Sequence, residues 1–130
     1  MNLPGNSRAI TQARTIARYG LTVIGWEGDV HAATEVLSQL VKNAVQHGVA
    51  PDNSAGEIGV SLAINEIEQL IIDVTDPSPF FPGFASALRG AQGRGLRIIQ
   101  RRQAEITWFA PPSLACKTVR ATMTAGTVDR

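Results

Sequence analysis

The sequence predicts an α+β fold, a two-layer sandwich in which helices cover one face of a mostly antiparallel sheet. Two segments in the first third of the chain repeat apolar residues at helical spacing. Four later segments alternate apolar with polar residues, as half-buried strands do. These four segments occur in two adjacent pairs with no helical pattern inside a pair, which favours hairpins over parallel crossover units.

The helical patterns come first. Residues 1–7 are expected to form a flexible arm. Asn6 or Ser7 is expected to cap a first helix, which ends near Gly20. The strongest helix follows Asp29, a residue type that caps helix N-termini. Its apolar stripe consists of Leu37, Leu40, Val41 and Ala44.

The strand patterns follow. Residues 58–64 and 70–76 are separated by a short turn and form the first predicted hairpin. Residues 104–109 and 116–123 form the second one. Between the hairpins, residues 77–92 are rich in proline and phenylalanine and are expected to be irregular, before a short helical pattern begins.

Length, charge and cysteine content exclude several function classes. A chain of 130 residues fits a single domain, with a core over about residues 8–123 and a second flexible end at 124–130. The net charge of +1 gives no general reason to expect a nucleic-acid-binding surface. One cysteine excludes an intrachain disulfide framework. Apolar stretches fall far short of the ~18–20 residues that cross a membrane, so we expect a cytoplasmic protein.

A cluster of glycines precedes the short helical pattern. Gly90, Gly93 and Gly95 lead into Leu96. Backbone N–H groups exposed at such a helix N-terminus can hold a phosphate. Glycine clusters are as often simple turns, and the spacing matches neither a dinucleotide-binding fingerprint nor a P-loop.

Two further patterns contain candidate ligands. Gln39, Asn43 and Gln46 or His47 share one polar stripe of the long helix, which is most often a solvated face. Asparagine is mildly unfavourable within a helix, and the side-chain oxygen of Asn43 is a suitable Mg²⁺ ligand beside a phosphate. Asp76 ends a strand, where its carboxylate could accept a hydrogen bond from the exocyclic amine of adenine. Aspartate before proline is also an ordinary turn former.

Taken in this order, these segments resemble the GHKL superfamily of ATP-binding domains, which have the Bergerat-type fold. The matching segments are QLVKNAVQHG at 39–48, DPSP at 76–79, GRGL at 93–96 and KTV at 117–119, within a resemblance that spans residues 10–123. The short chain is most similar to the stand-alone anti-sigma-factor serine kinases of bacterial partner switching. This resemblance implies ATP and Mg²⁺ as cofactors. It implies a sigma factor or an anti-anti-sigma (STAS-type) protein as partner, leaves a homodimer open, and involves no direct contact with nucleic acid or membrane.

The resemblance also implies roles for individual residues. Asn43 is the Mg²⁺ ligand, Asp76 binds adenine, and Thr118 supports the adenine pocket from the last strand. Residues 77–92 form a short lid over ATP. The other ATP-binding residues implied are Gln46, His47, Ser78, Arg89, Gly93, Arg94, Gly95 and Leu96.

One position departs from the family pattern. The family's kinases carry a glutamate four residues before the asparagine, taken to activate the attacking hydroxyl, where this chain has Gln39. An amide cannot accept that proton, and loss of a general base typically costs ~10²–10⁴-fold in rate. Glu35 lies one turn too early to replace it. Three functions therefore stay open: an ATP-dependent serine kinase, a non-catalytic ATP-dependent interaction module, and a subunit that keeps only the interaction surface.

Overall fold

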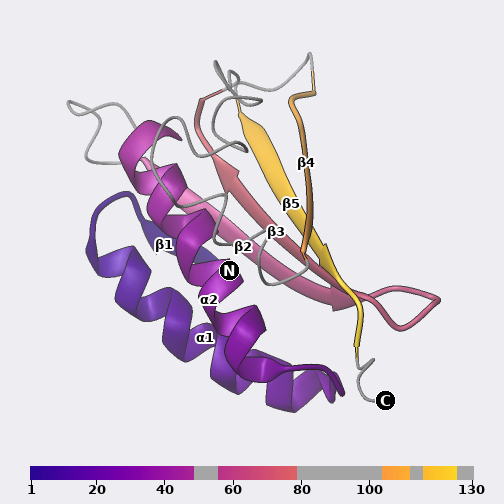
Figure 1. The fold of residues 1–130 in the computed structure, drawn as a ribbon. Coiled ribbons are helices and arrows are strands. Elements are labelled where there is room, and N and C mark those ends of the chain that lie inside the picture. The colour runs from indigo at the N-terminus through magenta and orange to yellow at the C-terminus, as the bar shows by residue number, and fades with distance from the viewer. Residues whose placement is uncertain (49–55, 79–103, 112–115, 126–130) are drawn as a thin grey trace.

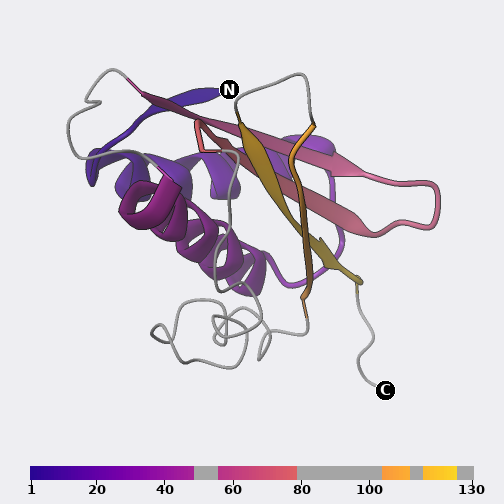
Figure 2. The same cartoon turned by 90° about the horizontal axis from the view of Figure 1, so that it is seen from above.

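The α+β two-layer architecture is confirmed. The computed structural model describes residues 1–48, 56–78, 104–111 and 116–125. Within these ranges, five strands form one antiparallel sheet in the order β1-β2-β3-β5-β4 (Figure 1). Figure 2, viewed from above, shows both helices on the same side of this sheet. The predicted helical pattern after Gly95 lies outside the described residues.

The described elements match both predicted hairpins. The helices are α1 (Arg8–Ile24) and α2 (Val30–Asn43), and a π-helical turn, η1 (Ala44–Gly48), continues directly from α2. The strands are β1 (Asn2–Pro4), β2 (Glu57–Ile64), β3 (Leu70–Asp76), β4 (Glu105–Phe109) and β5 (Lys117–Met123). β2 pairs with β3 and β4 with β5, and β3 joins the hairpins by pairing with β5. Neither described helix combines the length and the apolar character that a membrane span needs.

Helix α1 is longer than predicted. It continues through Gly20 and ends at Gly25, whose φ of 72° lies in the left-handed region that favours glycine. The backbone N–H of Gly25 donates to the carbonyl oxygens of Leu21 and Thr22. The predicted stop at Gly20 is wrong because the apolar stripe extends to the buried Leu21, and that burial outweighs the ~1 kcal/mol cost of a helical glycine.

The first residues are not a flexible arm. Asn2–Pro4 form the edge strand β1 against β2, and the main chain of Met1 pairs with that of Val60. Leu3 is buried in the core. A strand of three residues is too short to show a period-2 pattern, so the prediction of a flexible end missed it.

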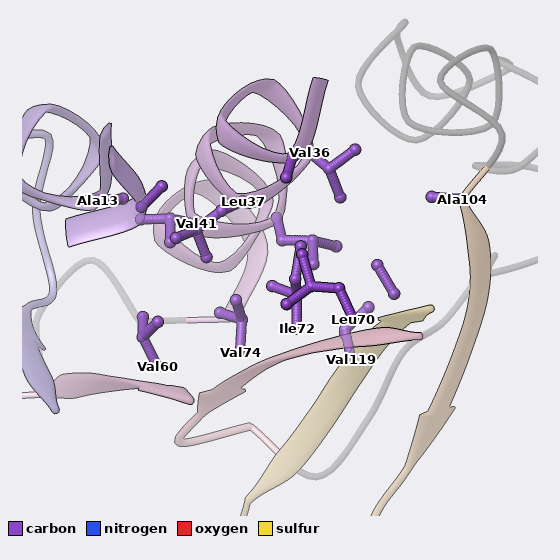
Figure 3. Close-up of a cluster of buried hydrophobic side chains, with 14 of the residues drawn as sticks. Ala13, Val36, Leu37, Val41, Val60, Leu70, Ile72, Val74, Ala104 and Val119 are labelled. Atoms are coloured by element: carbon purple, nitrogen blue, oxygen red, sulfur yellow. The ribbon is translucent and has the colours of Figure 1, made fainter. Parts of the chain in front are cut away.

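The core lies between the helices and the sheet. The side of α1 that is buried repeats at four-residue spacing and consists of Ala9, Ala13, Ala17 and Leu21. Small side chains along this stripe allow α1 to pack closely on α2. Figure 3 shows Val36, Leu37 and Val41 of α2 facing Ile72 and Val74 of β3. The predicted apolar stripe of α2 is therefore the helix face that covers the sheet.

The segment between α1 and α2 is held in place near both of its ends, by Asp29 and by Trp26. The predicted cap is confirmed, because the Asp29 carboxylate accepts a hydrogen bond from the backbone N–H of Ala32 at 3.0 Å. Trp26 is buried in the core, and Gly28 lies so close to its ring that a methyl group at position 28 would overlap ring atoms.

We expect the substitution Gly28→Ala to lower the free energy of unfolding by about 1–3 kcal/mol, because it overpacks the Trp26 ring. The matched control is Gly59→Ala, where a new methyl group would lie 3.7 Å from the side chains of Asn2 and Thr75. The control should match wild type or gain up to about 1 kcal/mol. Urea unfolding measures both variants, and equal stability of the two would contradict the packing described here.

Candidate functional site

Three elements meet at one edge of the sandwich. In Figure 1, the C-terminal ends of α2 and β3 and the first residues of β5 lie together at the top of the view. The turn η1, which begins directly after Asn43, packs against β3. Such π-helical turns are rare and are frequent at functional sites. This edge therefore carries the predicted candidates of the long helix and of the strand that ends at Asp76.

Asp76 and Lys117 form a buried ion pair at this edge. They are the last register pair between β3 and β5, and each is only 2% exposed. The Lys117 Nζ lies 3.0 Å from Oδ1 and 2.8 Å from Oδ2 of Asp76, so the ammonium group donates to both oxygens. The backbone N–H of Ser78 also donates to Oδ1, at 2.9 Å. The main chain of Ser78 therefore lies beside Asp76, and the predicted role of Ser78 in ATP binding stays a prediction.

The surroundings of this carboxylate are unfavourable to its charge. Burial raises the pKa of the Asp76 carboxyl above its usual range, and the hydrogen bonds from Lys117 and Ser78 only partly oppose that rise. Removing two charges from water costs several kcal/mol per ion, and apolar residues of similar volume often replace such a pair without loss of stability. The pair is therefore a weak stabiliser of the fold, and perturbed buried groups of this kind indicate a candidate functional site.

Thr118 does not reach this carboxylate. Strand alternation places it on the face opposite the helices, where its Oγ1 lies 2.7 Å from the Oγ1 of Thr75. The residue of the last strand that contacts Asp76 is Lys117, one position earlier. The predicted place of Thr118 in the adenine pocket stays a prediction, and the structure adds Lys117 as a second candidate on the same strand. The sequence alone could have indicated that Lys117 faces the core, because residues two apart in a strand face the same side and Val119 is buried.

The helix candidates lie partly open to solvent. Gln39 and Asn43 are half-buried one turn apart on α2, and Gln46 in η1 is exposed. Beside Gln39, the buried hydroxyl of Ser38 accepts a hydrogen bond from Arg14 Nη1 of α1 at 3.1 Å. This contact connects the two helices beside Gln39.

Part of the predicted site lies outside the described residues. This applies to the lid beyond Ser78 and to the side chain of His47. It applies equally to the predicted phosphate-side residues Arg89, Gly93, Arg94, Gly95 and Leu96. In the described ranges, no group of three or more His, Cys, Asp or Glu side chains could hold a metal ion.

The burial of the Asp76–Lys117 ion pair can be tested by measuring the free energy of unfolding of variants. We expect Lys117→Met to lower the free energy of unfolding near neutral pH by about 3–5 kcal/mol, because it leaves a buried carboxylate without its counter-charge. The double variant Asp76→Leu with Lys117→Met should stay within about 1 kcal/mol of wild type or exceed it.

The deficit of Lys117→Met should also depend on pH. Without the lysine, burial acts on Asp76 with less opposition, so the folded pKa of this carboxyl rises further above its unfolded value. A raised carboxyl pKa stabilises the folded state at low pH, and that contribution is lost as pH rises through the folded pKa. Urea unfolding of both proteins should therefore show a deficit that is small near about pH 4 and larger near about pH 7. A deficit that is the same at both values would contradict this assignment.

Comparison with known proteins places the chain by its fold. No family model and no curated protein matches it. A structure of the RsbU and RsbW domains from Mycobacterium tuberculosis matches with a TM-score of 0.66 and 22% identity, over 100% of this chain and 33% of that one. The SiaB–SiaC complex from Pseudomonas aeruginosa matches with a TM-score of 0.62 and 17% identity, over 95% and 88%. A blue-light activated histidine kinase domain from Erythrobacter litoralis gives 0.61 and 17%, over 95% and 62%.

The chain spans about a third of the length of the first of these structures. At identities of 17% to 22%, the similarity concerns architecture and not activity. The shared architecture is an antiparallel sheet with helices on one face, found in RsbW-like domains and in histidine kinase domains alike. The chain therefore has the GHKL-type fold.

Proposed function

We propose that this chain is an ATP-binding regulatory protein of the anti-sigma-factor kinase type. It acts in bacterial partner switching by binding a sigma factor or a STAS-type antagonist. The observation that carries this proposal is the buried Asp76 carboxylate, which ends β3 on the sheet face that α2 covers. The fold that the chain shares with an RsbW domain and with the SiaB–SiaC complex supports the same class of function.

The residues of this edge suit the parts of a nucleotide. Asp76 provides an acceptor for the exocyclic amine of adenine, and Asn43 provides an oxygen ligand for Mg²⁺. Bound ATP supplies the phosphoryl group that is transferred. Gln39, one turn before Asn43, can orient an incoming hydroxyl through its amide oxygen but cannot take its proton. Phosphoryl transfer depends largely on positioning and charge stabilisation, so slow transfer is compatible with an amide there.

A second function, a non-catalytic ATP-dependent interaction module, is favoured by one observation. Gln39 occupies the half-buried position beside the helix contact of Ser38 with Arg14, where the family's kinases carry a glutamate. The same pocket would then bind ATP only to set conformation and partner choice. Both functions require ATP binding, and they differ in whether the phosphoryl group moves to a partner.

Substitution of the magnesium ligand tests ATP binding. In calorimetric titrations with ATP and Mg²⁺, Asn43→Ala should weaken binding by roughly tenfold or more, because it removes an oxygen that holds the metal. The dependence of affinity on Mg²⁺ should also decrease. The matched control is Lys42→Ala, at the exposed neighbouring position of α2, and it should bind as wild type does. Equal affinities of all three proteins would place the nucleotide elsewhere.

Substitution of Gln39 distinguishes the two functions. We expect wild type to bind ATP but to transfer its phosphoryl group slowly, whereas Gln39→Glu restores a carboxylate of similar size. Transfer to a STAS-type partner in single-turnover experiments should then rise by about one or more orders of magnitude. Adding Asn43→Ala should abolish the gain if it acts through the magnesium-bound nucleotide. Rapid transfer by wild type would favour the kinase, and no gain in Gln39→Glu would favour the interaction module.

A further inference from the structure

The acceptor positions of Asp76 are largely filled from within the chain. Lys117 Nζ is within 3.0 Å of both carboxylate oxygens, so the ammonium group donates to both of them. The Ser78 backbone N–H uses a further position on Oδ1. An ionised carboxylate has about four acceptor positions, so three of them are in use. A base amine that binds this carboxylate would therefore compete with the Lys117 ammonium for its oxygens.

The two donors on Asp76 differ in how they can move. Ser78 donates from the main chain directly after β3, and its position follows the backbone. Lys117 donates from the end of a flexible four-carbon side chain, which can leave by rotation about its own bonds. A ligand can therefore displace Lys117 without changing the strand pairing of Asp76 with Lys117 in the sheet.

We infer that Lys117 is an internal competitor for the nucleotide base, and that it determines the affinity and the base specificity of this site. The inference rests on the proposed function, because it takes Asp76 as the base-binding carboxylate. A charged ammonium donor is stronger than the neutral amine of adenine, so exchanging one for the other is unfavourable. A base that carries a carbonyl oxygen in place of the amine can instead accept a hydrogen bond from Lys117. The Asp76–Lys117 pair therefore removes the preference for adenine that an unpaired carboxylate would have.

A purely structural role explains the pair less well. Burial acts on Asp76 more strongly than its hydrogen bonds do, and so the pKa of its carboxyl is raised although a lysine lies beside it. If the attraction of Lys117 outweighed the effect of burial, the pKa of this carboxyl would be lowered instead. The structure also offers an internal comparison. Arg120 of β5 pairs with Asp73 of β3 at 2.8 and 2.9 Å on the opposite face of the sheet, where both side chains are partly exposed.

The test compares two triphosphates that differ at the contacted atom of the base. Dissociation constants of the Mg²⁺ complexes of ATP and inosine triphosphate are measured by calorimetry for wild type, Lys117→Met and Arg120→Met. Wild type should bind both nucleotides within about threefold of each other. Lys117→Met should bind ATP about ten- to hundredfold more tightly than wild type and regain a preference for ATP of similar size. Arg120→Met removes a paired charge from the same strand and should behave as wild type.

The outcomes separate this inference from the proposed function. A wild-type preference for ATP of about tenfold or more would overturn the inference and leave ATP binding intact, and this ratio needs no variant to fold. Lys117→Met that binds ATP no better than wild type would overturn it as well. If none of the three folded proteins binds either triphosphate, the proposed function is wrong, and the inference fails with it.

Discussion

Two opposite charges lie in the apolar layer of this sandwich, where β3 ends and β5 begins. The ammonium group of Lys117 contacts both oxygens of Asp76, and neither side chain is appreciably exposed. Binding of the base at this edge depends on this contact, because the same carboxylate is its proposed acceptor. While the lysine stays in place, its ammonium group occupies acceptor positions on both oxygens of that carboxylate. Lys117 and the base compete for the Asp76 carboxylate. The ends of the strands, the turn after α2 and the backbone of Ser78 only position this carboxylate.

The neighbouring pair on the same two strands shows why burial matters. Asp73 and Arg120 also form an ion pair, and the guanidinium lies 5.4 Å from the centre of the Phe109 ring. That pair is partly exposed, so water offsets its charges and it needs no functional explanation. The pair of Asp76 with Lys117 lies on the helix-covered face and has no such compensation. An unfavourable pair at the edge where α2, β3 and β5 meet is more consistent with a binding role than with a structural one.

The architecture could be predicted from the sequence, because helical and strand periodicities indicate which residues face the core. Residues whose placement depends on tertiary contacts were missed. Gly20 lies inside α1 because Leu21 is buried beyond it, and Asn2–Pro4 form a strand only because β2 offers an edge. For the candidate site, helical spacing grouped Gln39 with Asn43 and the strand pattern ended at Asp76, and their roles stay predictions. The contact of Lys117 with Asp76 was missed, because a motif does not specify which side of a strand a residue faces.

A high-resolution structure of the complex with Mg²⁺ and a non-hydrolysable ATP analogue would show whether the base and Lys117 use the same carboxylate. The expected structure has the adenine amine within hydrogen-bonding distance of Asp76, Lys117 Nζ withdrawn from both carboxylate oxygens, and the Ser78 backbone contact retained. A complex in which adenine lies elsewhere while Lys117 still bridges Asp76 would contradict the account.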